Sequence, residues 1–262
     1  MNYWRRKEEM AIKAKEHVEN LLSNHKDEII EACLKSNVFE DKKLTTNLNT
    51  HNYETKIAVE DLTTVEAVRK YHKETDKLGV LNFSSFKTPG GKFLEGAMAQ
   101  EETLCHNSLL YPVLVYNKDF YAYNNCNLNK GLYHNRAIYS PDINFLIEHN
   151  CKANILTCAA PNKLNCINYN KFTFEENSKY LKSRIDFILN IFAQTYNEVL
   201  ILGAYGCGVF NQDPREVASI FNDLLKTKYI GVFKKVIFAV PNINSNNPNY
   251  TEFNNILGFD NI

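Results

Sequence analysis

A short apolar strand followed by a glycine-containing loop and a helix occurs twice in this chain, and this repeated unit constrains the fold most strongly. The first unit spans Leu78–Tyr111, and the second spans Glu198–Pro214. Six of the ten glycines follow the strands of these two units. Further strands and helices alternate along the chain, which predicts a three-layer α/β/α sandwich with a mixed, largely parallel sheet.

The first unit is predicted to comprise a buried strand at Val80–Phe83, a loop through Lys87–Gly91 and a helix from about Phe93. Pro89 disfavours helical backbone at the residue before it, and the two glycines after it allow another group to approach the backbone closely. The N–H groups of such a loop, together with the positive end of a helix, can receive an anion. A plain turn without a ligand is the alternative interpretation.

The helix of this unit carries Gln100, Glu101 and Glu102 among apolar neighbours. Because successive helix positions lie about 100° apart, the two carboxylates cannot both point directly away from an apolar packing face. At least one of them is therefore expected in a partly dry place, where burial and mutual repulsion keep one carboxyl protonated near neutral pH. A raised pKa suits a general acid, whereas a solvated helix face is the alternative.

The second unit is predicted to comprise a strand at Val199–Leu202, a loop with glycines at 203, 206 and 208, and a helix from about Pro214. Two such loops at the carboxyl ends of neighbouring strands would form a cleft suited to a diphosphate. The glycine order differs from the G-x-G-x-x-G of a dinucleotide-binding unit. The first unit also lacks the lysine and hydroxyl of a Walker loop.

The rest of the chain completes the predicted organisation. The expected elements are charged helices over residues 3–35, a polar connector over 36–53, a strand at Lys56–Val59, a helix from Thr63 or Thr64 to about Lys73, a long loop over 117–136, a strand at Asn154–Ala160, a helix over 175–196 with Arg184 and Asn190 off its apolar stripe, a strand at Lys235–Val240 and a short C-terminal helix. We therefore expect an N-terminal helical extension and connector over residues 1–53 and a main domain over 54–262.

Composition excludes several classes of protein. A chain of 262 residues that is 44% hydrophobic can bury one sizeable core, and zero formal net charge argues against an electrostatic nucleic-acid binder. Seven irregularly spaced cysteines predict no disulfide framework, and the segment Cys158–Cys166 lacks the second pair of a zinc site. The charged N-terminus and the absence of a long apolar run argue against a signal peptide or membrane span. We expect a cytoplasmic monomer without a metal or cofactor.

The first unit resembles the signature of the bacterial-type poly(ADP-ribose) glycohydrolases, a family of the macrodomain superfamily. That signature is GGG followed by QEE; here PGG follows the strand VLNF and precedes QEE, and the likeness extends through LNFSS and GAMAQEETLCHNSLLYPVL. Lys92 stands in place of the third glycine, where it could crowd a phosphate or help to bind it. The segments GAYGCGVF and Ala137–Asp142, which contains YSP ahead of a predicted strand, are further landmarks, so the resemblance spans about residues 54–256.

The resemblance implies a macrodomain-like fold and a glycosidase that releases ADP-ribose by cleaving the ribose O-glycosidic bond of ADP-ribose polymers or conjugates without a metal. By their match to QEE, Glu102 acts as the acid and then the base, Glu101 holds a ribose hydroxyl and Gln100 supports the site. Asn82 is a candidate second hydroxyl ligand, with a structural hydrogen bond within a turn as the alternative. The other residues expected to bind ADP-ribose are Ser85, Pro89, Gly90, Gly91, Lys92, Gly203, Ala204, Tyr205, Gly206, Cys207, Gly208, Val209 and Phe210, the last against the distal ribose.

Three other functions stay open at this stage. A reader module would bind ADP-ribose without cleaving it, and Lys92 favours this alternative. A related hydrolase would cleave a mono(ADP-ribosyl) conjugate, a nucleobase adduct or a cyclic derivative. A helical interaction protein acting through residues 1–40 would explain none of the glycine loops. Tyr133 or His134 of the predicted 117–136 loop could also border a ligand.

Overall fold

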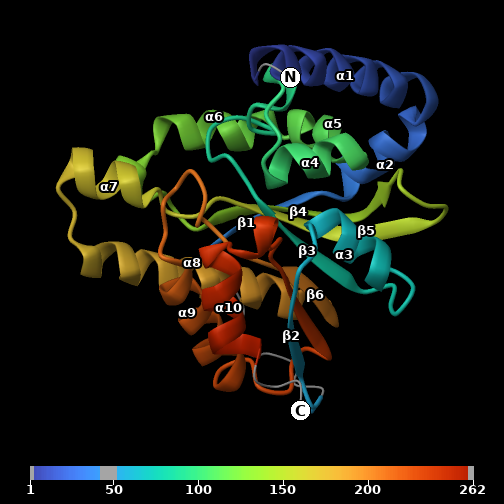
Figure 1. The fold of residues 1–262 in the computed structure, drawn as a ribbon. Helices are drawn as coiled ribbons and strands as arrows, with labels where there is room; N and C mark the ends of the chain where they lie inside the picture. Colours follow the sequence, from blue (N-terminus) through green and yellow to red (C-terminus); the bar gives the residue numbers. More distant parts are fainter. Residues whose placement is uncertain (1–2, 42–51, 259–262) are drawn as a thin grey trace.

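The structure, a computed structural model, describes residues 3–41 and 52–258 (Figure 1). Its seven strands form one sheet in the order β1-β4-β5-β3-β6-β7-β2. The strands are β1 (Asn37–Glu40), β2 (Lys56–Glu60), β3 (Leu78–Phe83), β4 (Arg136–Phe145), β5 (Cys151–Cys158), β6 (Val199–Leu202) and β7 (Lys235–Ala239). The described helices are α1 (Tyr3–Asn24), α2 (Lys26–Lys35), α3 (Thr64–Tyr71), α4 (Gln100–Asn107), α5 (Leu110–Tyr116), α6 (Lys118–Cys126), α7 (Lys163–Asn170), α8 (Phe174–Gln194), α9 (Pro214–Lys226) and α10 (Pro248–Leu257).

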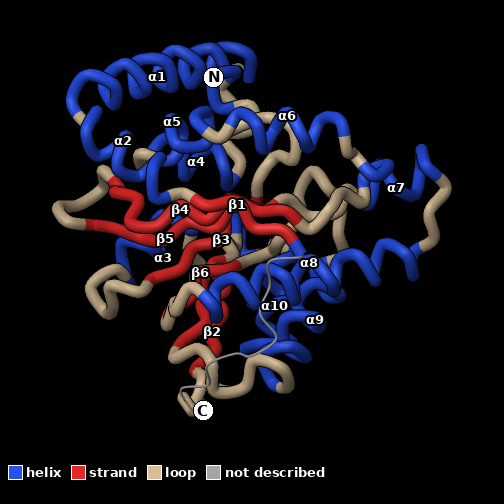
Figure 2. Tube along the Cα trace, turned by 180° about the vertical axis from the view of Figure 1, so that it is seen from behind, coloured by secondary structure: helices blue, strands red, loops and turns tan. Residues whose placement is uncertain are grey.

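Helices cover both faces of the sheet, as the views from the front and from behind show (Figures 1 and 2). Helices α1 to α6 pack on one face, and α8, α9 and α10 pack on the other, each group around its own apolar cluster. Five neighbouring strands, from β5 to β2, are parallel, whereas β4 runs antiparallel to β5 and to β1. The predicted three-layer sandwich with a mixed, largely parallel sheet is confirmed.

The two repeated units lie side by side at the centre of the sheet. β3 pairs with β6 through Val80 and Ile201, and it pairs with β5 through Phe83 and Cys158. These strands are almost entirely apolar and buried, as expected of parallel strands covered on both faces. Since all three strands are parallel, the loops that follow β3, β5 and β6 all leave the sheet at the carboxyl ends of the strands. Open α/β sheets bind their ligands at this end.

Several element boundaries were predicted well. Helix α3 begins after Thr63, whose side chain caps it, and Glu66 completes a capping box, so the predicted helix start is confirmed. The strands β2, β6 and β7 and the helices α8 and α9 lie where the sequence placed them within a few residues. The N-terminal region contains two helices, as expected for residues 3–35.

Other boundaries were wrong. The expected connector contains strand β1, which pairs with β4 at an edge of the sheet, and the expected loop over residues 117–136 contains α6 and a 3₁₀ turn. The segment Ala137–Asp142 lies inside β4 instead of preceding a strand, and a register shift follows Ser140. Residues 42–51 of the connector lie outside the described residues, and the division into domains at residue 53 stays a prediction.

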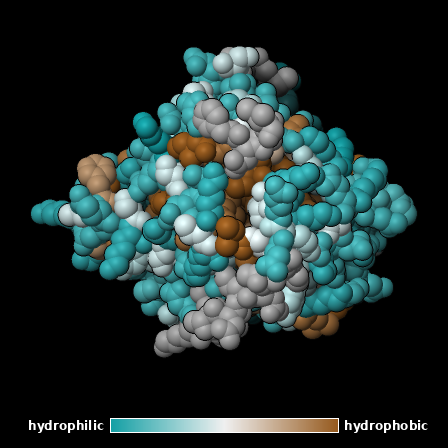
Figure 3. All heavy atoms as spheres, turned by 90° about the horizontal axis from the view of Figure 1, so that it is seen from below, coloured by the Kyte–Doolittle hydropathy of each residue, from teal (hydrophilic) through white to brown (hydrophobic). Residues whose placement is uncertain are grey.

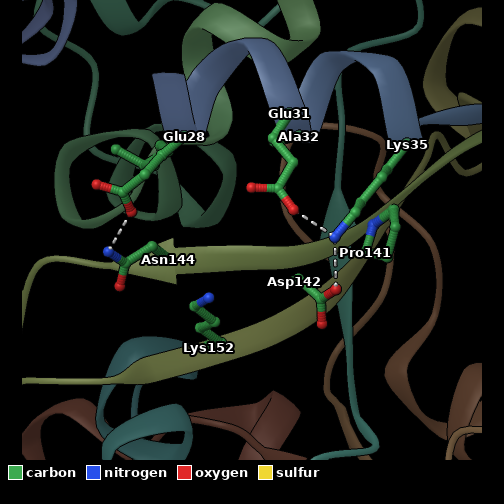
Figure 4. Close-up of a pocket in the computed structure, with 9 residues that line it drawn as sticks. Glu28, Glu31, Ala32, Lys35, Pro141, Asp142, Asn144 and Lys152 are labelled. Atoms are coloured by element: carbon green, nitrogen blue, oxygen red, sulfur yellow. Dashed lines mark hydrogen bonds and ion pairs between the residues drawn. The ribbon is translucent and has the colours of Figure 1, made fainter. Parts of the chain in front are cut away.

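Helix α2 is attached to β4 by polar pairs at the surface, as the close-up shows (Figure 4). Lys35 lies 2.7 Å from Glu31 and 3.4 Å from Asp142, and Asn144 donates a hydrogen bond to Glu28 at 2.9 Å. The side chains surround a pocket of only about 40 Å³. Because exposed ion pairs contribute little, the buried apolar face of α2 supplies most of the attachment energy.

The surface seen from below is mostly hydrophilic, and its exposed apolar side chains gather near the centre of that face (Figure 3). None of the described helices is long and apolar enough to cross a bilayer.

Helix α1 braces the segment that leads from the first glycine loop to α4. Gly96 has φ of +79°, and a Cβ at this position would lie 1.9 Å from the carbonyl oxygen of Lys7 and 2.9 Å from the nitrogen of Ala11. Only glycine permits both this backbone conformation and this close approach to a helix backbone. The segment that contains Gly96 and the N-terminal helix α1 are therefore closely packed against each other at this contact.

Replacing Gly96 with alanine should weaken this contact. We expect Gly96→Ala to lower the free energy of unfolding by about 1–3 kcal/mol, because the new methyl group overpacks against α1 in a strained conformation. Urea unfolding followed by circular dichroism measures the loss. Gly208→Ala is the matched control, since a Cβ there meets no atom within 4 Å. Equal stability of the two variants would contradict the proposed brace.

Candidate active site

Helix α4 begins at Gln100, so Gln100, Glu101 and Glu102 form its first turn. The expectation of a helix start near Phe93 is wrong: Phe93–Glu95 form a 3₁₀ turn that ends at Gly96 in the left-handed conformation. Both carboxylates therefore occupy the positive end of the helix, which is favourable for negative charge.

Gln100 fastens this turn to the central strand. Its side-chain oxygen accepts a hydrogen bond from the Phe83 N–H at 2.8 Å, and its amide group donates to the Leu81 carbonyl at 2.8 Å and to Thr64 at 3.2 Å. The predicted supporting role of Gln100 thus has a geometric basis. It ties α4 to β3 and α3, which holds the two glutamates at a set distance from the sheet edge.

Glu101 is almost fully buried, with 3% of its surface exposed. The N–H of Ser85 donates to one of its oxygens at 2.7 Å, the side-chain amide of Asn82 donates to the other at 3.3 Å, and the N–H of Gly90 also hydrogen-bonds it. Asn82 itself is fully buried and donates to Thr157 as well. Asn82 therefore positions Glu101 in this structure, and its predicted role as a ligand of a ribose hydroxyl stays a prediction.

Glu102 is also buried, and the N–H of Lys92 donates to its Oε1 atom at 2.9 Å. Gly91, at φ of +59°, lies so close that a Cβ would be 2.6 Å from that Glu102 oxygen and 3.0 Å from an oxygen of Glu101. The N–H of Gly91 is bonded to the Thr88 carbonyl. The first glycine loop therefore encloses the protein's own carboxylates, and the N–H groups of Gly90 and Gly91 already have protein partners, which argues against their predicted use for the diphosphate.

The second glycine loop leaves several of its backbone N–H groups without a partner among the described residues, although those of Tyr205 and Cys207 are bonded within the loop. In the described part of the chain, the N–H groups of Gly206, Gly208, Val209 and Phe210 donate to no backbone carbonyl, whereas that of Tyr205 bonds the Gly203 carbonyl. Gly206 has φ of +76° and packs its Cα against Ala160, and the space beside Gly208 is empty. This loop matches the backbone nest that anions prefer.

The two loops face one cavity of about 620 Å³, the size of a small-molecule site. Its lining comprises Phe83, Ser84, Ser85, Thr88, Gly91, Lys92, Ala97, Ala99, Gln100, Glu101, Glu102, Ala160, Ala204, Tyr205, Gly206, Gly208, Val209 and Phe210. Gly91 and Gly206 thus lie on walls of the same cleft, and Glu102 reaches it. The spatial meeting of the two units, which the sequence predicted, is confirmed.

Five predicted binding residues do not line this cavity: Asn82, Pro89, Gly90, Gly203 and Cys207. Gly203 is buried against the Ala239 carbonyl, where a Cβ would come within 2.6 Å, so close packing explains this glycine. Gly90 is packed in the same way, against Tyr111.

Sequence reasoning missed six residues of the lining: Phe83, Ser84, Thr88, Ala97, Ala99 and Ala160. Most of them neighbour predicted residues along the chain. Ala160 follows β5 and could have been predicted to line the cavity, because the small residues at the end of this buried strand leave space for a ligand beside β3.

An aromatic cluster supports one wall of the cavity. Tyr133 stacks on Phe86 with ring centroids 4.0 Å apart, and it meets the edge of Phe210 at 6.2 Å. Phe210 lines the cavity, whereas Tyr133 lies behind it. Tyr133 therefore contributes to the wall through Phe210, and neither it nor His134 is among the lining residues.

A buried arginine lies beneath the loop that follows β5. Arg184 is fully buried, which contradicts its predicted place off the apolar face of the 175–196 helix. It donates to the carbonyl of Ala159, to Asn135 at 2.5 Å and to the Leu132 carbonyl at 3.4 Å. Because these acceptors are neutral, Arg184 adds positive potential next to Ala160 and so favours an anion in the cleft.

Burial has a direct electrostatic effect on the glutamate pair. The pKa of Glu101 is raised from 4.5 to about 8, mainly through loss of solvation; the charge of Glu102 contributes to the rise, and the N–H donors from Ser85 and Gly90 oppose it. Glu101 is therefore protonated at neutral pH, as predicted for one carboxyl of the pair. Within the described residues, no group of three or more His, Cys, Asp or Glu side chains is arranged to hold a metal ion.

This pKa predicts a pH dependence of stability. Between about pH 4.5 and 8 the folded state keeps a proton on Glu101 that the unfolded state releases, so stability should fall as pH rises through this range and level off above it. Urea unfolding at intervals from pH 5 to 9 measures this decrease. Glu101→Gln should flatten the profile, whereas the exposed control Glu95→Gln should not. Parallel profiles for wild type and Glu101→Gln would contradict the raised pKa.

Comparisons with known proteins agree with this geometry. The family model "Microbial-type PARG, catalytic domain" matches residues 7–147. The structure of poly(ADP-ribose) glycohydrolase (PARG) from Thermomonospora curvata is 29% identical, covers 95% of this chain and 100% of its own, and has a TM-score of 0.86. The same enzyme bound to the inhibitor ADP-HPD is 30% identical over 95% of this chain and 99% of its own, with a TM-score of 0.84.

PARG from Deinococcus radiodurans in complex with ADP-ribose is also similar, at 30% identity over 87% of this chain and 96% of its own, with a TM-score of 0.79. No curated protein matches the sequence. The family model covers more than half of the chain and the structures nearly all of it, and this protein therefore belongs to the microbial-type poly(ADP-ribose) glycohydrolase family.

Proposed function

We propose that this protein is a glycosidase that cleaves the ribose–ribose O-glycosidic bond of poly(ADP-ribose) and releases ADP-ribose. Family membership supports the reaction class. The observation that carries the proposal is that Glu102 lines the same cavity as the second glycine loop, where the N–H groups of Gly206, Gly208, Val209 and Phe210 have no backbone partner among the described residues. One wall can bind the diphosphate while the other presents a carboxyl group to the anomeric carbon.

Binding is assigned to the second loop. The N–H groups of Gly206, Gly208, Val209 and Phe210 would donate to the diphosphate, and the buried charge of Arg184 would add to the attraction. Phe210, supported by Tyr133, would pack against the distal ribose. Glu101, protonated at neutral pH, would donate a hydrogen bond to a ribose hydroxyl while its other contacts to Ser85 and Asn82 hold it in place.

Glu102 carries both proton transfers. The reacting form of the enzyme carries a proton on Glu102 as well as on Glu101. In the first step the Glu102 carboxyl group donates its proton to the glycosidic oxygen as the bond from that oxygen to the anomeric carbon breaks, and positive charge develops on the ribose. In the second step the carboxylate takes a proton from a water molecule, whose oxygen bonds to the anomeric carbon. The Lys92 N–H fixes one Glu102 oxygen, which leaves the other for this chemistry.

A glutamine at position 102 should separate catalysis from binding. We expect Glu102→Gln to lower kcat with poly(ADP-ribose) by a factor of about 10² or more, because the amide can neither donate the proton nor accept one from water. Release of ADP-ribose measured by mass spectrometry gives the rate, and calorimetry should show that free ADP-ribose still binds. Glu95→Gln, in the same segment but exposed, is the control. Turnover close to wild type would remove Glu102 from the mechanism.

A side chain at Gly208 should fill the phosphate end of the cleft. We expect Gly208→Val to weaken ADP-ribose binding about tenfold or more, because its branched side chain would occupy the open space next to the N–H groups. The free energy of unfolding should change little, since no protein atom lies there. Unchanged affinity measured by calorimetry would argue against this loop as the diphosphate site.

Incubation of the wild-type protein with poly(ADP-ribose) also separates the enzyme from a reader module, because a reader releases no ADP-ribose. The predicted cytoplasmic location and monomeric state stay predictions.

A further inference from the structure

Among the described residues that line the cavity, Lys92 is the only basic one. Its backbone is held firmly: the N–H donates to Glu102, and the carbonyl accepts from the N–H groups of Glu95 and Ala97 at 3.0 and 3.1 Å. With φ of −107° and ψ of 33°, the position accepts a side chain without the strain that would demand glycine. The side chain of Lys92 therefore starts from a fixed point next to the Glu102 carboxylate.

The ammonium group of Lys92 is available for a ligand. Its side chain is 69% exposed, and the nearest carboxylate, that of Glu95, is 4.0 Å away and itself 61% exposed. A pair of this kind is weak in water, so a stronger anion can replace Glu95 without a large cost. The lysine side chain is long and flexible, and it carries its charge as a compact donor suited to phosphate oxygens.

The position of this charge relative to the two loops defines its role. The diphosphate of the ADP-ribose unit that is released is assigned to the second loop, whereas Lys92 belongs to the first loop, and its N–H donates to Glu102. The leaving oxygen must face Glu102, and Lys92 is hydrogen-bonded to Glu102 through its N–H, so the leaving group departs next to the part of the wall that Lys92 forms. In poly(ADP-ribose) that leaving group is the ribose of the next adenosine, whose 5′ oxygen carries another diphosphate.

We propose that Lys92 binds the diphosphate of the leaving ADP-ribose unit and gives the enzyme a preference for anionic leaving groups. The inference rests on the proposed function and adds to it a subsite on the leaving-group side of Glu102. Lys92 is then a residue that sets substrate specificity, whereas the neutral N–H groups of the second loop serve any ADP-ribosyl substrate.

Two substrates with different leaving groups test the subsite. Poly(ADP-ribose) has an anionic leaving group, and the 4-nitrophenyl glycoside of ADP-ribose has an uncharged one until its bond breaks. The measured quantity is the ratio of the two kcat/KM values, for wild type, Lys92→Met and Lys92→Arg. Methionine keeps the length of the side chain and removes its charge, and arginine keeps the charge.

We expect Lys92→Met to lower the ratio of kcat/KM for polymer over nitrophenyl glycoside about fivefold at low ionic strength, mainly through KM for the polymer. Lys92→Arg should restore the ratio, and added salt should reduce the difference between wild type and Lys92→Met, because the charge is exposed. Lys87→Met is the matched control: Lys87 belongs to the same loop and is exposed, but it does not line the cavity, so its ratio should equal that of wild type.

The possible failures are distinct. If Lys92→Met changes both substrates by the same factor, or if Lys87→Met shifts the ratio as much, the subsite is wrong while the glycosidase function stands. If wild type cleaves neither substrate, the proposed function fails first.

Discussion

The structure depends on one constraint: two neighbouring carboxylates removed from water need hydrogen-bond donors around them. Glu101 and Glu102 receive these donors from the loop between Ser85 and Lys92, together with the side chain of Asn82. An unsatisfied charge in such a place would be expensive, so the loop can adopt few other conformations. The positive φ angles of Gly90 and Gly91 follow from this need, because the backbone must turn tightly around the acids. The fit of Gly96 against α1 holds the other end of the same segment.

The two glycine loops use their backbone N–H donors in opposite ways. In the first, N–H groups are directed inward to the protein's own acids and fix a reactive group. In the second, they are left without protein partners and present a binding surface. Glycine suits both loops, since it has no Cβ and therefore allows another group to come close to the backbone N–H groups. A site of this kind divides positioning and ligand binding between two strands that are neighbours in the sheet but far apart in the chain.

The sequence allowed much of this arrangement to be predicted. The continuous apolar runs of β3 and β6 identified central parallel strands, and the angle between adjacent helix positions was enough to predict a buried carboxylate. The start of α4 could not be found in this way, because Ala97, Met98 and Ala99 continue a pattern that helices tolerate, and only the packing of Gly96 on α1 shows why the chain breaks there. Strand β1 has four residues and exists through its pairing with β4, a contact that local patterns do not encode.

The same limit applies to the individual residues of the site. Sequence spacing could not show that the N–H groups of Gly90 and Lys92 are used by Glu101 and Glu102, because hydrogen-bond partners depend on tertiary approach. Nor could it place Arg184 in the interior, since an arginine on a helix is usually solvated and its neutral acceptors come from two distant loops.

The strand order has a consequence for how the protein is made. Strand β2 finds its sole partner in β7, Lys56 opposite Lys235, and β3 acquires β6 only after most of the chain has left the ribosome. A nascent chain must therefore carry β2 and one side of β3 unpaired until the later strands have been made, a period in which aggregation competes with folding. Enzymatic competence can emerge only after β6 and the loop that follows it have been synthesised, since one wall of the cleft is built from earlier codons and the other from later ones.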